Sequence, residues 1–131
     1  MGFFIYFILY LKYTKSTDSA ISIGEETEYS TSEKIVGSWI DGKPIYQKTI
    51  NFGSLPNASD KSVAHGISSI GYVVDIKGTA KSGSSYSLIN DVNTTTNIIN
   101  RVYVDATNVT IQTKNDRTAW TAYITIQYTK A

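Results

Sequence analysis

Residues 33–48 read Glu-Lys-Ile-Val-Gly-Ser-Trp-Ile-Asp-Gly-Lys-Pro-Ile-Tyr-Gln-Lys, with the dipeptide Asp41-Gly42 near their centre. Asp-Gly between apolar β-forming residues is among the strongest local hairpin signals, because a type I′ turn needs positive φ at both central positions. The segment therefore predicts two antiparallel strands joined by a two-residue type I′ turn. Pro44 indicates an edge position or an irregular ladder at that end, because proline has no N–H to donate.

The clearest strand signal further along the chain is period-two alternation at residues 120–129. One set of positions is apolar and the other is rich in threonine: Trp120, Ala122, Ile124, Ile126 and Tyr128 alternate with Thr121, Tyr123, Thr125, Gln127 and Thr129. Such alternation places the two sets on opposite faces of a strand.

Three other segments, residues 71–79, 98–104 and 109–112, also have the pattern of strands. In the first of them, Tyr72, Val74 and Ile76 are expected on the face opposite Val73, Asp75 and Lys77. Turn-forming residues separate all these runs, as in antiparallel sandwiches. The sequence therefore predicts an all-β, antiparallel, jelly-roll-like β-sandwich.

The amino-acid composition excludes several classes of protein. The chain has 131 residues, which suits one domain, and no cysteine, which excludes disulfides and thiolate chemistry. Its net charge is +1 with only 18% charged residues, which argues against a nucleic-acid-binding protein with a basic stripe. Its 10 tyrosines suit either a β core or a carbohydrate-binding surface, because a tyrosine ring has a flat apolar face and a polar edge.

The first part of the chain differs from the rest. We divide the chain into an N-terminal apolar arm with a polar linker, residues 1–28, and a sandwich domain, residues 29–131. The run Phe3–Leu11 is continuously apolar but shorter than the about 20 residues that span a bilayer. Three interpretations stay open: an arm that packs on partner subunits or on a particle, a short membrane-associating or targeting segment, and an upstream extension of the reading frame.

The residues needed for catalysis are sparse, so we do not expect an enzyme. His65 is the single histidine and precedes a glycine, where hydrogen bonding to the backbone is its more common role. The aspartates lie mostly in predicted turns, and no pair of carboxylates can be assigned to a cleft. Glu25, Glu26 and Glu28 lack the spacing of a calcium loop, and phosphate-binding glycine motifs are absent from the sequence. We expect neither a cofactor nor a metal.

The loop at residues 115–118 carries the candidate ligand-binding groups. Asp116 and Arg117 lie close in sequence to Trp120, and this combination can hydrogen-bond to a sugar and stack on it. The alternative is a structural hairpin loop whose arginine pairs with aspartate or with a neighbouring subunit. With Tyr123 and Tyr46, these three residues form the set of candidate ligand-binding residues.

Five segments, residues 29–46, 51–56, 64–67, 105–111 and 116–130, share their order and spacing with a known pattern. They resemble the C-terminal β-sandwich domain of tail or head fibre-type virion proteins of bacteriophages and prophages of Gram-positive or gut bacteria. The resemblance implies a distal virion domain, commonly a homotrimer, that displays a surface for attachment to the host. The implied partners are two further copies of the chain, other virion proteins bound through the N-terminal segment, and a host surface polysaccharide.

The first 28 residues depart from that pattern, because they carry none of the fibrous repeats that usually precede such tips. A complete small fibre or decoration protein and a tip of a longer fibre both remain open. Other interpretations are a purely structural capsid or tail decoration protein, a monomeric bacterial surface carbohydrate-binding module and, least favoured, an enzyme.

Overall fold

The computed structural model describes residues 28–90, 92–93 and 98–131. The apolar arm and nearly all of the linker lie outside these residues. Nine strands follow one another within these described ranges: β1 (Lys34–Ser38), β2 (Pro44–Ser54), β3 (Asp60–Ala64), β4 (Ile70–Ser82), β5 (Ser85–Leu88), β6 (Val92–Asn93), β7 (Ile98–Val104), β8 (Asn108–Thr113) and β9 (Thr121–Lys130). No helix in the described part of the chain has the length and apolar character that crossing a membrane requires.

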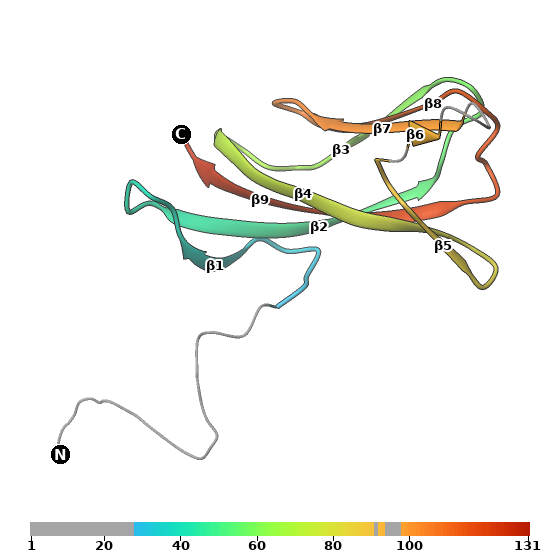
Figure 1. The fold of residues 1–131 in the computed structure, drawn as a ribbon. Helices are drawn as coiled ribbons and strands as arrows, with labels where there is room; N and C mark the ends of the chain where they lie inside the picture. Colours follow the sequence, from blue (N-terminus) through green and yellow to red (C-terminus); the bar gives the residue numbers. More distant parts are fainter. Residues whose placement is uncertain (1–27, 91, 94–97) are drawn as a thin grey trace, which may run out of the picture.

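The strands form two antiparallel sheets that pack face to face (Figure 1). One sheet has the order β1-β2-β9-β4-β5 and the other the order β3-β8-β7-β6. The chain changes sheets between β2 and β3, β3 and β4, β5 and β6, and β8 and β9. The predicted antiparallel β-sandwich is confirmed. The central strand of the larger sheet is β9, which lies between β2 and β4.

The predicted hairpin is formed by β1 and β2, but the predicted type of turn is wrong. The Trp39 N–H donates to the Lys43 carbonyl at 2.8 Å, so three residues lie between the last paired positions. Gly42 has φ of 87°, and Asp41 is not among the residues with positive φ. This is the geometry of a three-residue loop, in which only the glycine needs the left-handed conformation. The Asp41 carboxylate instead accepts a hydrogen bond from the Lys43 N–H at 3.0 Å.

The apolar core lies between the sheets, and β9 provides its centre. The predicted apolar set of this strand is buried at Ala122, Ile124, Ile126 and Tyr128, while Trp120 is half-buried against them. The other sheet contributes Val109 and Ile111 of β8. The rest of the buried apolar cluster comes from β2, β4 and the connecting segments: Ile50, Phe52, Leu55, Ile67, Ala80 and Ile89.

Strand β4 departs from the simple alternation that its sequence predicts. Its register against β9 shifts twice, between Ile70 and Val73 and between Val73 and Asp75. Each such irregularity changes which side chains face the core. Val73 and Ile76 therefore both pack against the core, although they were expected on opposite faces. Tyr72 is exposed and stacks on Trp39, with 5.6 Å between the ring centroids.

Candidate functional site

The outer face of the five-stranded sheet, turned away from the core, carries a regular array of polar side chains. The register of β2, β9 and β4 aligns them in three cross-strand rows: Thr49–Thr125–Lys77, Asn51–Tyr123–Thr79 and Ser54–Thr121–Lys81. Tyr123 occupies the middle of the central row. Directly opposed residues on one face of a sheet are close enough to act on the same ligand.

A hollow of about 360 Å³ lies on this face. Its walls include three tyrosines, Tyr29, Tyr86 and Tyr123, which are 62%, 66% and 59% exposed. Four threonines contribute hydroxyl groups to it: Thr49, Thr79, Thr121 and Thr125. We call this site the tyrosine hollow. It combines flat apolar rings with groups that both donate and accept hydrogen bonds.

The segment that carries Tyr29 is attached to β2. The Thr49 N–H donates to the Ser30 carbonyl at 2.8 Å, and the Gln47 side-chain amide donates to the Glu28 carbonyl at 3.2 Å. Gln47 in turn accepts a hydrogen bond from the Gln127 side chain at 2.8 Å. These contacts fix the backbone on both sides of Tyr29, at the edge of the tyrosine hollow.

Two threonines of the hollow are bonded to each other across the sheet. The hydroxyl oxygens of Thr49 and Thr125 are 2.9 Å apart. This pair leaves each hydroxyl with hydrogen-bonding capacity for a ligand, because a hydroxyl has one donor and two acceptor sites. The pair therefore holds the floor of the hollow in place, and Thr49 is its more accessible member, because Thr125 is only 7% exposed.

Gly78 allows β4 to approach the central tyrosine closely. Its φ is 155°, and a Cβ at this position would overlap the Tyr123 carbonyl oxygen. Only glycine fits such a backbone contact without displacement of one strand. The position of Tyr123 within the hollow thus depends on a residue without a side chain.

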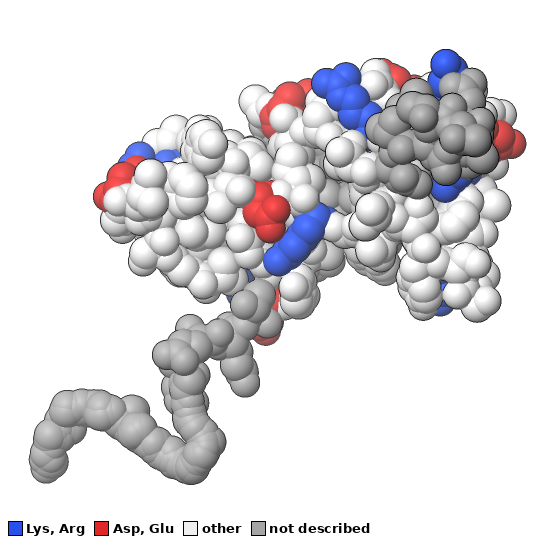
Figure 2. Space-filling view, viewed as in Figure 1, with Lys and Arg blue, Asp and Glu red and all other residues white. Residues whose placement is uncertain are grey.

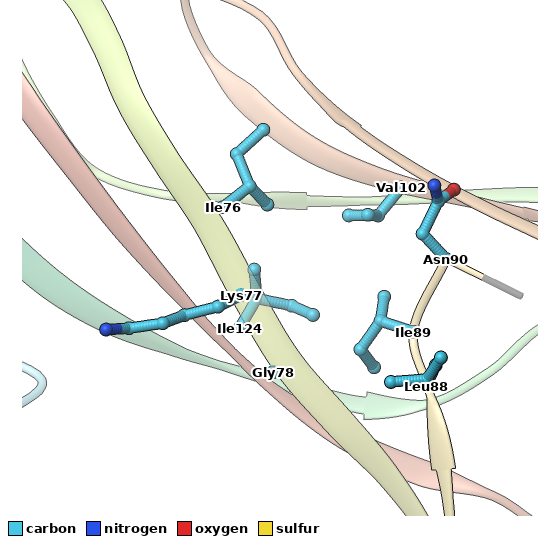
Figure 3. Close-up of a pocket in the computed structure, with 8 residues that line it drawn as sticks. All are labelled: Ile76, Lys77, Gly78, Leu88, Ile89, Asn90, Val102 and Ile124. Carbon is cyan, nitrogen blue, oxygen red and sulfur yellow. The ribbon is translucent and has the colours of Figure 1, made fainter.

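A second hollow, of about 240 Å³, lies at the core side of the same sheet. Figure 3 shows Ile76, Ile89, Val102 and Ile124 around it, and it shows the Lys77 side chain extending away from them. The lining is aliphatic apart from Lys77, Gly78 and Asn90. Such a lining packs apolar groups but offers few hydrogen bonds. The tyrosine hollow is therefore the better candidate for binding a polar ligand, because its threonine hydroxyls both donate and accept hydrogen bonds.

The candidate residues of the 115–118 loop make contacts within the sandwich itself. Arg117 is only 9% exposed, and its guanidinium lies 4.8 Å from the centroid of the Trp120 ring. The Asp116 carboxylate accepts hydrogen bonds from the Thr118 N–H at 3.0 Å and from its hydroxyl at 2.7 Å. These bonds lower the pKa of Asp116. Asp116 therefore stabilises the loop, and Arg117 and Trp120 are already stacked on each other.

Tyr46 belongs to a cluster at another part of the larger sheet. Its ring stacks on Tyr128 at 5.9 Å, and the Lys130 ammonium lies 5.3 Å from its centroid. The Tyr128 hydroxyl donates to the Glu33 carboxylate, which also pairs with Lys130 at 3.1 Å. Burial raises the pKa of Tyr128, and the bond to Glu33 raises it further.

Glu33 itself has a pKa below its ordinary value. Burial alone would raise the pKa of this carboxyl, but the hydrogen bond from Tyr128 and the charge of Lys130 outweigh that effect. This cluster ties the start of β1 to the end of β9. Of the five candidate residues, Tyr123 is thus the one that lines the tyrosine hollow.

His65 has the structural role that its position before a glycine indicates. It is buried, its Nδ1 accepts from the Ile67 N–H at 3.0 Å, and its Nε2 lies 2.9 Å from the Asp105 carbonyl oxygen. Both ring nitrogens therefore form hydrogen bonds with backbone groups. Within the described ranges, the structure brings no three histidine, cysteine, aspartate or glutamate residues together in a way that could hold a metal ion.

The surface charges are dispersed on the face that Figure 2 shows, where acidic and basic side chains are scattered among uncharged ones. Comparisons with protein-family models, with curated proteins and with solved structures found no match.

Proposed function

We propose that this protein is an attachment domain of a bacteriophage virion and that it binds a bacterial surface glycan in the tyrosine hollow. The observation that carries the binding part is the grouping of Tyr29, Tyr86 and Tyr123 around a threonine floor on one open sheet face.

The chemistry of the hollow suits a sugar. A pyranose ring has an apolar face of C–H groups, which packs on aromatic rings, and a rim of hydroxyls, which need directional partners. The threonine hydroxyls provide such partners, since each can donate and accept. The rings stand on three different parts of the chain, the lead-in to β1, strand β5 and strand β9. This arrangement favours an extended ligand that lies across several strands.

The assignment to a virion rests on the resemblance of residues 29–131 to fibre-type tip domains. In that setting the sandwich would be distal and trimeric, and residues 1–28 would attach it to other virion proteins. A decoration protein without a receptor and a monomeric bacterial carbohydrate-binding module are the competing assignments. Tail or capsid genes beside the reading frame, together with a trimeric mass in solution, would support the virion assignment, whereas a monomer would contradict the proposed trimer.

Substitution of the central ring tests the binding site. Tyr123→Ser removes a wall of the hollow, while Tyr72→Ser removes an equally exposed tyrosine, also 59% exposed, that lies outside it. On a glycan array and on bacterial cells, Tyr123→Ser should weaken binding by about tenfold, the equivalent of one aromatic contact of about 1.4 kcal/mol.

Tyr72→Ser should leave that binding unchanged. If the unaltered protein binds neither glycans nor cells, the attachment function is wrong and the decoration role is favoured. Equal losses in the two variants would place the binding site elsewhere.

A further inference from the structure

Two lysines flank the tyrosine hollow. Lys77 and Lys81 are on the outer face of β4, in the rows on either side of the Tyr123 row. The Lys77 ammonium lies 5.7 Å from the centroid of the Tyr29 ring, and the Lys81 ammonium lies 5.8 Å from that of Tyr86. Each positive charge is therefore held beside a ring that forms a wall of the hollow.

These two charges are not neutralised by carboxylates of the described chain. Among residues 28–90, 92–93 and 98–131, the ion pairs are Lys34 with Glu28 and Lys130 with Glu33. The residues that line the hollow include no aspartate or glutamate. The nearest acid on the outer face of β4 is Asp75, whose partner in the register is Gln127, outside the hollow.

We infer that the ligand of the tyrosine hollow is an anionic polysaccharide, whose carboxylate or phosphate groups pair with Lys77 and Lys81 while its sugar rings pack on the tyrosines. This inference rests on the proposed glycan-binding function and specifies its ligand class. A neutral glycan would leave both ammonium groups without a negative partner at the edge of the bound ligand. An acidic polymer would neutralise these two charges and would also pack its sugar rings on the tyrosines.

The spacing of the lysines indicates a polymer rather than a small acid. Lys77 and Lys81 are four residues apart along one strand, which separates their Cα atoms by about 13 Å at about 3.3 Å per residue. Tyr123 of the adjacent strand lies in the row between them. The two ammonium groups lie at different rings, Lys77 at Tyr29 and Lys81 at Tyr86, so a chain with repeated charges can pass over Tyr123 and contact each of them.

The experiment compares three immobilised polymers: polygalacturonate, which carries carboxylates, poly(glycerol phosphate), which carries phosphates, and neutral dextran. The double variant Lys77→Gln/Lys81→Gln is compared with the matched control Lys43→Gln/Lys114→Gln, which removes the same charge from exposed lysines outside the hollow. The unaltered protein should prefer at least one acidic polymer over dextran, with affinity that falls as salt is added.

The Lys77→Gln/Lys81→Gln variant should lose about tenfold in affinity for that acidic polymer, because each exposed charge pair contributes a few-fold. The control should lose less than about twofold, since its lysines lie apart from the ligand. Preference between the carboxylate and the phosphate polymer identifies the acidic group.

Two results would overturn the inference separately from the proposed function. Binding to dextran that depends on Tyr123 but not on Lys77 and Lys81 would leave glycan binding intact and exclude the acidic ligand. Equal losses in the two double variants would show attraction by overall charge rather than by the hollow. If no polymer and no glycan on the array binds, glycan binding itself fails, and the inference fails with it.

Discussion

The two faces of β9 show how one strand divides its residues between stability and recognition. On the core side, Ile124 and Ile126 are fully buried, with Ile50 of β2 opposite Ile124 and Ile76 of β4 opposite Ile126. On the outer side, Tyr123 is exposed between threonine- and lysine-bearing rows. Because successive side chains point to opposite faces, the two roles are interleaved residue by residue. Substitutions at adjacent positions should therefore have effects of different kinds.

The largest effect is expected from the core side. Ile124→Ala removes a fully buried side chain and leaves a cavity beside Ile76, so it should lower the free energy of unfolding by about 3 kcal/mol. Chemical denaturation measures this loss. Below the unfolding transition, affinity for the glycan should be retained, because the side chain does not reach the outer face. A loss of affinity in the folded variant would contradict the separation of the two faces.

Gly78→Ala should affect both faces at once, because this glycine borders both hollows. The new Cβ would overlap the Tyr123 carbonyl oxygen, and the unusual φ adds strain, so we expect a loss of about 2 kcal/mol together with weaker glycan binding. The control is Gly37→Ala, whose Cβ would be 4.0 Å from its nearest neighbour, Ile45. That variant should be as stable as the unaltered protein in the same denaturation experiment, and equal stability of both variants would exclude the predicted contact.

Glu33→Gln tests the cluster that anchors the chain just after Tyr29. The variant loses the ion pair with Lys130 and weakens the bond to Tyr128, at a cost of about 1 kcal/mol at neutral pH. The pKa of Glu33 is lower in the folded protein than its ordinary value of 4.5. Its stabilising contribution is therefore complete above about pH 4.5 and is lost as the pH falls through the lower, folded-state pKa.

Thermal unfolding between pH 3 and 7 checks this expectation. The difference in melting temperature between the unaltered protein and Glu33→Gln should shrink toward the acidic end of the range. A difference that is constant with pH would show that the charge of Glu33 does not contribute to stability.

The smallest effect on stability is expected from the outer side. Tyr123→Ser removes an exposed ring and should change the free energy of unfolding by less than about 0.5 kcal/mol, although it should weaken glycan binding by about tenfold. In the double variant with Ile124→Ala, the two stability changes should add, because the side chains lie on opposite faces. Clear non-additivity in denaturation would show that the core and the tyrosine hollow are coupled.

The sequence predicted the parts of the fold that depend on local pattern. The alternation at residues 120–129 and the Asp41-Gly42 hairpin both indicated strands that the structure contains. It did not predict the form of the turn, because a three-residue loop and a two-residue loop use the same Asp-Gly signal. It also did not predict the irregular register of β4, which follows from pairing with β9 rather than from the sequence of β4 itself.

The candidate site could be predicted only in part. Tyr123 was among the candidates, but its neighbours in the hollow come from segments far away in the sequence. Thr49 and Thr125, for example, are separated by 76 positions and meet only because β2 pairs with β9. Arg117 and Trp120 showed the opposite problem, because residues suited to a ligand also suit each other. Sequence alone cannot distinguish these uses, since they depend on which groups the folded chain leaves exposed.

The central place of β9 also affects how the protein is made. Strands β2 and β4 each pair with β9 in the larger sheet, yet β9 is synthesised after the other strands of the described chain. During translation, the facing edges of β2 and β4 therefore stay unpaired until β9 is made, and unpaired strand edges favour association with other chains. Completion of the larger sheet is thus a late, long-range step. Chains interrupted before residue 121 should be the ones that aggregate in the cell.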